Sequence, residues 1–453
     1  MSPTVEVIET SELGDRSYVA HDGTVAVVID PQRDLDRVER LLAELGVRCE
    51  MVLETHVHND YVSGGLELAR RSGARYAVSG AEPVEFDRLA VADGDELRAG
   101  RLRIQAIATA GHTDHHLSYR ISDDGAGPSA VFTGGSLLYG GVGRTDLVDE
   151  SRTEELTRAQ FRSAWRLVEL AGDQDRVFPT HGFGSFCASG AAAGGESSTI
   201  GAERARNEAL TIADEDAFVH RLVANLNAYP SYYVHMDARN REGAGPADLS
   251  PPTRVRPEEL RKRLAAGEWV VDLRDRTAYA AAHLGGSMGI ELGEQFSTYL
   301  GWLIPWGSPL TLIGERPEQV ADAQRQLVRI GIDRPDGAAV GEPDELADGG
   351  EVRTYPKVGF AELARARGRQ GVVVLDVRGE GERASGSIPG AAHIPVYSIL
   401  DRLDEVPPGQ LWVHCGSGYR ANIAASVLER AGHDVVLVDD LYATAVESGL
   451  ATG

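Results

Sequence analysis

The chain is poor in lysine and in positive charge. Its 453 residues include only two lysines, Lys262 and Lys357, and 69 acidic residues against 45 basic ones give a formal net charge of −24. An acidic surface repels the phosphates of nucleic acids and of anionic lipid headgroups, so we expect neither as a partner. No apolar run approaches the roughly 20 residues of a membrane span, and the first residues lack the charged-then-apolar order of a signal peptide.

Cysteine is also scarce, and its three positions exclude a disulfide framework. Cys49, Cys187 and Cys415 cannot all pair, and their spacing matches no metal-binding motif. This usage fits a reducing compartment, so we expect a cytoplasmic protein. The length predicts about three domains at roughly 100–200 residues each, with boundaries in the Gly/Pro-rich stretch 240–252 and in segment 342–355.

The most informative motif that is present places two histidines and an aspartate after a short apolar run. His56 and His58 stand two residues apart, and Asp60 follows at the fourth position after His56. Residues 51–53 before them are typical of a buried strand, so the loop begins where that strand ends. Imidazoles and a carboxylate at this spacing can converge on a divalent cation.

Two further turns each present one histidine after a predicted strand. His112 follows the alternating residues 102–106, and His181 follows residues 177–178. Loops at neighbouring strand ends can direct such side chains toward one point. A comparable turn after residues 130–132 carries Gly135, which has no side chain to contribute.

With these motifs, residues 1–240 resemble the metallo-β-lactamase fold, in the branch that holds persulfide dioxygenases and hydroxyacylglutathione hydrolases. The resemblance implies an α/β protein whose first domain is an αββα sandwich. It also implies that His56, His58 and His112 belong to a first metal site. Asp60 and His181 would belong to a second.

The sequence departs from this family at two positions. Tyr61 stands where the family has another histidine, and Gly135 stands where it has a ligating carboxylate. With few donors left, a dinuclear hydrolase is disfavoured. We expect His56, His58 and His112 to hold one metal, with Asp60 and His181 as further ligands or as supports. The resemblance favours Fe(II), and Zn(II) stays an alternative because no anionic ligand is assured.

Two segments resemble the persulfide dioxygenases in particular. Residues 140–146 match their Gly-Arg-Thr-Asp segment, and residues 181–187 match members that are fused to rhodanese domains. Arg144 is predicted to bind the carboxylate of a thiol peptide such as glutathione, because a guanidinium matches a carboxylate in bidentate fashion. A structural salt bridge to Asp146 is the open alternative.

A second candidate centre lies in the last hundred residues. Residues 411–414 predict a buried strand, residues 421–431 predict a helix, and Cys415 begins the glycine-rich loop between them. Backbone N–H groups in such a loop point at the sulfur and favour the thiolate, which is the nucleophile. We therefore predict a reactive cysteine.

The loop resembles the active loop of rhodanese sulfurtransferases, and the resemblance covers residues 355–453. It implies that Cys415 carries the sulfur and that Arg420 stabilises the persulfide anion. The remaining loop positions would form the persulfide-binding cradle: Gly416, Ser417, Gly418 and Tyr419.

A weaker copy of the same pattern spans residues 254–345. It repeats two rhodanese-like marks, but Gly314 stands where the cysteine is expected. Without a thiol this repeat cannot carry sulfur. We expect a catalytically silent rhodanese-like domain that acts as a spacer.

The sequence therefore predicts a persulfide dioxygenase fused to a sulfurtransferase. Its partners would be a small thiol persulfide and either sulfite or thiosulfate. Two alternatives remain: a degenerate metal domain that serves as a binding scaffold, and a zinc-dependent thioester hydrolase. No sequence feature selects a surface for a homo-oligomer, so the oligomeric state is left open.

Overall fold

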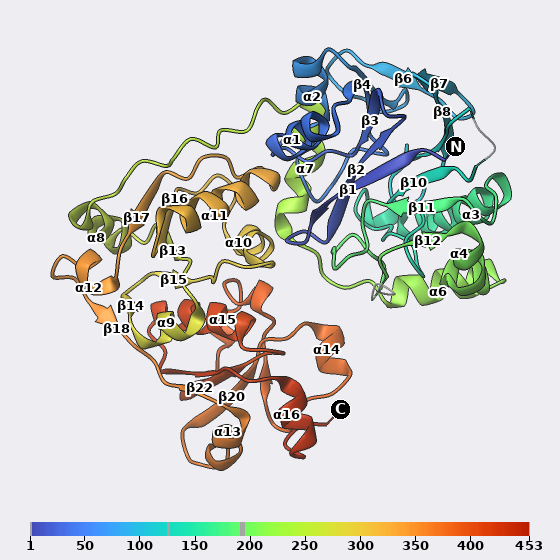
Figure 1. Ribbon diagram of the computed structural model, residues 1–453. Helices are drawn as coiled ribbons and strands as arrows, with labels where there is room; N and C mark the ends of the chain where they lie inside the picture. The colour runs from blue at the N-terminus through green and yellow to red at the C-terminus, as the bar shows by residue number, and fades with distance from the viewer. Residues whose placement is uncertain (1, 125–126, 191–194, 453) are drawn as a thin grey trace. The chain divides into compact units, whose positions relative to one another are not determined.

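The structure is a computed structural model that describes residues 2–124, 127–190 and 195–452. It contains two compact units: the first runs up to Ala247, and the second takes most of the chain from Asp248 on. Figure 1 shows the chain coloured from blue at its N-terminus to red at its C-terminus. Within the described ranges, no helix combines the length and the apolar character needed to cross a bilayer.

The first unit is built on two six-stranded sheets. One has the order β1-β2-β3-β4-β5-β6 and the other the order β12-β11-β10-β9-β8-β7. The strands of the first sheet are β1 (Thr4–Thr10), β2 (Asp15–His21), β3 (Val25–Ile29), β4 (Arg48–Leu53), β5 (Arg75–Ser79) and β6 (Leu89–Val91). Those of the second are β7 (Glu96–Ala99), β8 (Leu102–Ala108), β9 (Leu117–Ser122), β10 (Ala130–Gly134), β11 (Arg176–Pro179) and β12 (Ser198–Thr199).

The core of this unit lies between the two sheets. Alternate residues of the strands point inward, among them Val27 and Leu53 from the first sheet and Tyr119 and Phe132 from the second, all fully buried. Two further apolar clusters lie on the outer faces, one under the α1 and α2 helices and one under α3. Helices therefore cover both sheets, and the predicted αββα sandwich is confirmed.

Figure 1 shows α1 and α2 beside the blue strands and α3, α4 and α6 beside the green ones. The helices of the first unit are α1 (Asp36–Leu45), α2 (Gly65–Ser72), α3 (Thr153–Leu170), α4 (Ile200–Arg206), α5 (Glu208–Thr211), α6 (Glu215–Ala224) and α7 (Met236–Glu242), with short 3-10 turns η1 (Glu150–Arg152) and η2 (Ser231–His235).

The second unit contains two parallel sheets. The orders are β15-β13-β16-β17 and β19-β23-β22-β20-β21. The strands of the first sheet are β13 (Trp269–Asp272), β15 (Met288–Gly289), β16 (Leu310–Gly314) and β17 (Gly337–Val340). Those of the second are β19 (Lys357–Val358), β20 (Val372–Asp376), β21 (Ala392–His393), β22 (Gln410–His414) and β23 (Val435–Val438). The short strands β14 (His283–Leu284) and β18 (Val352–Arg353) pair separately.

The helices of this unit are α8 (Pro257–Ala265), α9 (Arg276–Ala281), α10 (Phe296–Leu303), α11 (Pro317–Arg329), α12 (Pro343–Leu346), α13 (Phe360–Ala366), α14 (Glu380–Ala384), α15 (Tyr419–Arg430) and α16 (Tyr442–Glu447), with 3-10 turns η3 (Val396–Ser398) and η4 (Leu403–Glu405).

The two parallel sheets share one winding order. Apart from β19 at the edge of the five-stranded sheet, the first strand of each sheet is flanked by the second on one side and by the third on the other, and the fourth follows the third. Strands β13 and β20 each end in an aspartate that forms a salt bridge with the arginine two residues later. The distances are 2.7 Å for Asp272 with Arg274 and 2.8 Å for Asp376 with Arg378. Gly314 comes directly after the residue that pairs with Asp272, and Cys415 comes directly after the residue that pairs with Asp376. Gly314 and Cys415 therefore occupy corresponding positions in the two sheets.

Candidate metal centre and sulfur-transfer loop

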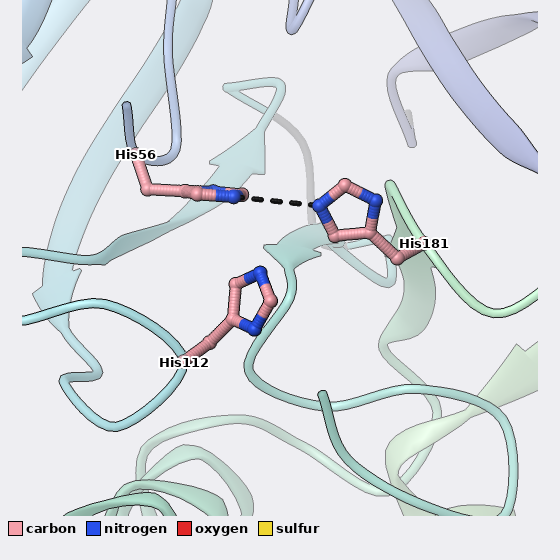
Figure 2. Close-up of side chains that lie close together, drawn as sticks. All are labelled: His56, His112 and His181. Carbon is pink, nitrogen blue, oxygen red and sulfur yellow. Dashed lines mark hydrogen bonds between the residues drawn. The ribbon is translucent and has the colours of Figure 1, made fainter. Parts of the chain in front are cut away.

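Three histidines from three separate loops meet inside the first unit. His56 follows β4, His112 follows β8 and His181 follows β11, and each lies beyond the end of its strand. One ring nitrogen from each lies within 4.8 Å of the others, and the residues are at most 1% exposed. Figure 2 shows the three rings facing one another, with His56 Nε2 and His181 Nε2 3.3 Å apart.

The Nδ1 atom of each of these rings faces an oxygen atom of the protein. This contact fixes the ring and leaves Nε2 for the centre of the cluster, as in metal-binding histidines generally. The pairs are His56 with Thr55 Oγ1 at 2.8 Å, His112 with the Arg144 carbonyl at 2.7 Å and His181 with Asp15 Oδ1 at 2.9 Å.

Electrostatics keep two of the rings neutral. Burial and the neighbouring imidazoles lower the pKa of His56, and burial followed by the charge of His181 lowers the pKa of His112 to about 3. For His181, burial acts downward as well, but Asp60 and Asp15 together raise its pKa above the ordinary value. His56 and His112 are therefore in the neutral form that binds metals at pH 7.

His58 was predicted to complete the group with His56 and His112, but its Nε2 atom faces other partners. Its Nε2 lies 2.9 Å from Tyr61 Oη, 3.3 Å from Glu54 Oε2 and 3.4 Å from Asp30 Oδ1. Burial opposes the charged form, but Asp30 and Glu54 raise the pKa of His58 to about 9. The group that His56 and His112 form within ligand distance therefore contains His181, while Nε2 of His58 faces two buried carboxylates.

Several buried atoms around the cluster lack a hydrogen-bond partner among the described residues. They are His112 Nε2, His58 Nδ1 and both carboxylate oxygens of Asp60, although Asp60 Oδ2 lies 3.2 Å from His181 Nδ1. His58, Asp60 and His181 also form a second group with ligand-to-ligand distances within 4.8 Å. Buried lone pairs without donors are costly. The donor set therefore fits a bound cation.

The two departures from the family pattern are explained by close packing. A Cβ atom at Gly135 would lie 2.5 Å from Cγ and 2.7 Å from Nε2 of His112, so the imidazole occupies the space in which a side chain would begin. Gly143 contacts the same ring from another direction. At the other departure, Tyr61 is fully buried and its hydroxyl lies between His58 and the Asp30 carbonyl.

Arg144 has a structural role in this geometry. Its guanidinium makes a bidentate pair with Asp146, with both distances 2.7 Å, and donates to the carbonyls of Phe186 and Asn227. The residue is 2% exposed. These bonds use four of the five guanidinium N–H groups. The salt bridge to Asp146 that the sequence left open is therefore observed, and binding of a substrate carboxylate stays a prediction.

In the second unit, Cys415 lies between the end of β22 and the start of α15. The N–H groups of Ser417 and Gly418 point at its Sγ from 3.5 and 3.2 Å, as predicted for a loop that stabilises a sulfur anion. Gly418 has φ +91°, and a Cβ there would overlap the Asp439 carboxylate, so glycine is required at this turn. Cys415 is 1% exposed, so the loop shields the thiol from bulk water.

Two residues near this loop were missed by sequence reasoning. Glu382 holds Arg420 in a bidentate ion pair, with Nη2 2.7 Å from Oε1. Tyr299, from the other half of the unit, is 5% exposed, and burial raises its pKa to about 12 although Arg420 opposes the shift. Glu382 lies just beyond the strand that ends at Asp376, a position that could have been inferred from the topology. Tyr299 gave no such signal, because its half of the unit carries no cysteine.

Comparisons with known proteins agree with this architecture. The Rhodanese-like domain family matches residues 360–442. Over 218 residues, the chain is 31% identical to the human mitochondrial persulfide dioxygenase ETHE1, an overlap of 48% of this chain and 75% of that protein. It is 38% identical over 128 residues to a hydroxyacylglutathione hydrolase of Acidiphilium cryptum, an overlap of 28% of this chain and 50% of that protein. A metallo-beta-lactamase crystal structure from Staphylococcus aureus superposes with TM-score 0.66 at 26% identity, covering 75% of this chain and 98% of that one.

The fold and the histidine cluster thus define a metallo-β-lactamase-fold protein with a candidate metal centre, followed by a rhodanese domain. Both parts point to an enzyme of sulfur metabolism. By its match to ETHE1, the chain belongs to the persulfide dioxygenase family.

Proposed function

We propose that the first unit oxidises the outer sulfur of a low-molecular-weight thiol persulfide with O2, and that Cys415 transfers sulfane sulfur. In the first reaction, a persulfide, O2 and water give the thiol and sulfite; the sulfur loses four electrons to O2. In the second, a persulfide on Cys415 passes its outer sulfur to sulfite, which gives thiosulfate and the free thiolate. The buried imidazole cluster in a chain of this family is the observation that carries the proposal.

The residues present fit a ferrous ion, which when bound would supply redox chemistry toward O2 and a site for the substrate sulfur. His56, His112 and His181 would hold it through Nε2. Both carboxylate oxygens of Asp60 are buried without a hydrogen bond from the described residues, so Asp60 would add the negative charge that Gly135 does not provide. His58 presents Nδ1 to the same region.

For the sulfur-transfer step, the Cys415 loop holds the sulfur anion with backbone N–H groups. Arg420 is predicted to stabilise the persulfide, and Glu382 holds its guanidinium in an ion pair. We propose that the pair positions the loop, and that the half with the matching sheet is a silent rhodanese-like repeat that contributes Tyr299. Its Gly314 leaves it without a nucleophile.

Metal analysis and O2 uptake test the first activity. Purified protein should contain iron and consume one O2 for each sulfite formed from glutathione persulfide or a smaller alkyl persulfide. Replacing His112 with alanine should remove both the iron and the O2 uptake. A preparation that is loaded with iron and shows no O2 uptake on any persulfide would contradict the proposal.

A zinc enzyme is the second candidate, and one observation favours it. Three imidazoles without a carboxylate in their own group form a ligand set typical of catalytic zinc. Zinc in the purified protein together with thioester cleavage would select this function. Protein that binds neither metal while Cys415 remains active would instead select the binding scaffold.

A further inference from the structure

A group of buried polar side chains surrounds the Nε2 atom of His58. Glu54 Oε2 lies 3.3 Å from this nitrogen, Asp30 Oδ1 lies 3.4 Å from it and the Tyr61 hydroxyl lies 2.9 Å from it. These four residues, called the His58 group below, are each at most 1% exposed. The dioxygenase and sulfur-transfer reactions proposed above use none of the three oxygen atoms.

The distances within the His58 group are those expected between ligands of one metal ion. Ligand atoms that are each about 2.1 Å from a metal lie roughly 3.0–3.4 Å apart in octahedral or tetrahedral geometry. The two carboxylate oxygens are 3.3 and 3.4 Å from His58 Nε2. One ligand atom each of Asp30, Glu54 and His58 also lies within 4.8 Å of the other two. The three atoms would therefore reach one cation with little movement.

The charges of the His58 group are not balanced by another side chain. Two carboxylates face one imidazole, which carries at most one positive charge. Among the described residues, neither Asp30 nor Glu54 forms an ion pair with an arginine or a lysine, and His58 is the partner of both. Buried negative charge without a full counter-charge is costly. A divalent cation would balance both carboxylates.

Glu54 provides an acceptor that the protein leaves unsatisfied. Its Oε1 accepts from the Ser63 hydroxyl, whereas its Oε2 is buried without a hydrogen-bond partner among the described residues and faces His58 Nε2. Asp30 Oδ1 accepts from the Thr55 amide at 2.7 Å, which leaves its second lone pair. A bound cation would occupy these lone pairs and remove the cost of leaving them unpaired.

We propose that Asp30, Glu54 and His58 Nε2 form a second cation site, which takes a divalent transition-metal ion, with the Tyr61 hydroxyl as a neutral fourth donor. Two carboxylates and one imidazole suit Mn²⁺ or Zn²⁺. The ion would be structural: it would fix the His58 ring, whose centroid lies 4.1 Å from that of His56 in the histidine cluster. The site does not depend on the proposed reactions.

Mn²⁺ binding to the His112→Ala protein tests the second site. This replacement removes a ligand of the histidine cluster and none of the His58 group. Metal-free protein is titrated with Mn²⁺, and the free ion is followed by electron paramagnetic resonance. We expect at least one Mn²⁺ to bind per chain. Adding Glu54→Gln to this variant should weaken that binding at least tenfold, because the amide replaces one of two anionic ligands.

Glu82→Gln, added to the same His112→Ala protein, is the matched control. Glu82 is also a buried glutamate of the first unit whose Oε2 has no hydrogen-bond partner among the described residues, but it lies outside the His58 group. This replacement should leave Mn²⁺ binding unchanged. If His112→Ala protein binds no Mn²⁺, or if Glu54→Gln and Glu82→Gln have the same effect, the inference is overturned, and a proton on His58 is the only cation of the group.

A second measurement decides the question if Glu54→Gln prevents folding. Crystals of the unmodified protein, soaked in Mn²⁺, should show an anomalous scattering peak within roughly 2.5 Å of Asp30 Oδ1, Glu54 Oε2 and His58 Nε2. Soaked crystals without a peak at this position would overturn the inference. Neither measurement involves O2 uptake, so failure of the proposed function and failure of the second site are told apart.

Discussion

Replacing Gly135 with alanine tests how tightly the histidine cluster is packed. The added Cβ would lie 2.5 Å from His112 Cγ, whereas ordinary contact begins near 3.4 Å, so the ring or the backbone must move by roughly 1 Å. The backbone is held on both sides: the Gly135 N–H donates to His116 Nε2 at 3.0 Å, and its carbonyl accepts from Gly143 at 2.9 Å. The His112 ring is therefore the part that moves, and it leaves the cluster.

The expected result is a loss of metal affinity of at least 10- to 100-fold, the usual cost of disturbing the groups that orient a ligand, and a destabilisation of about 1–3 kcal/mol from overpacking. Chelator competition measures the affinity, and denaturant unfolding of the metal-free protein measures the stability. Gly141→Ala is the control, because a Cβ there meets nothing within 4 Å. Unchanged metal affinity in Gly135→Ala would refute the view that His112 is a ligand in the observed position.

Three further predictions concern the second unit. Cys415→Ser should abolish sulfur transfer to sulfite and leave the metal content unchanged; residual transfer would remove Cys415 as the carrier. Burial lowers the pKa of His414 to about 4, so this residue takes up its proton more readily in the unfolded chain than in the folded one. As pH falls from 6.5 to 4, the free energy of unfolding should therefore drop by about 3 kcal/mol, and by less in His414→Asn. Tryptophan fluorescence during urea unfolding measures the drop, and an equal dependence of the free energy of unfolding on pH in the two proteins would contradict the prediction. Tyr299→Phe should slow transfer several-fold without altering metal content, and an unchanged rate would exclude a role for its hydroxyl.

The strands and loops that carry both centres were predicted correctly from the sequence. The runs before His56, His112, His181 and Cys415 are all strands, and the loops begin where those strands end. The period-2 pattern and the turn residues carry this information locally. The helix after Cys415 begins two residues earlier than predicted, at Tyr419, which places Arg420 in its first turn.

The orientation of single side chains could not be predicted in the same way. His58 Nε2 faces Asp30, a residue 28 positions earlier that directly follows strand β3, and Arg144 is held by the carbonyl of Asn227, 83 positions later. Such contacts depend on tertiary packing, and residue spacing does not encode them. For the same reason, residue spacing does not place Tyr299 beside the Cys415 loop.

Asp30 links two of the loops that carry the histidines. It is one of two non-glycine residues with positive φ among those described, at +49°, and its carboxylate accepts from the Thr55 amide and hydroxyl at 2.7 Å and from the Thr180 hydroxyl. Thr55 and Thr180 immediately precede His56 and His181. One carboxylate thus anchors the first and the last of the three loops, and neither can swing open alone. Loading and release of a cation would therefore proceed as a single concerted opening.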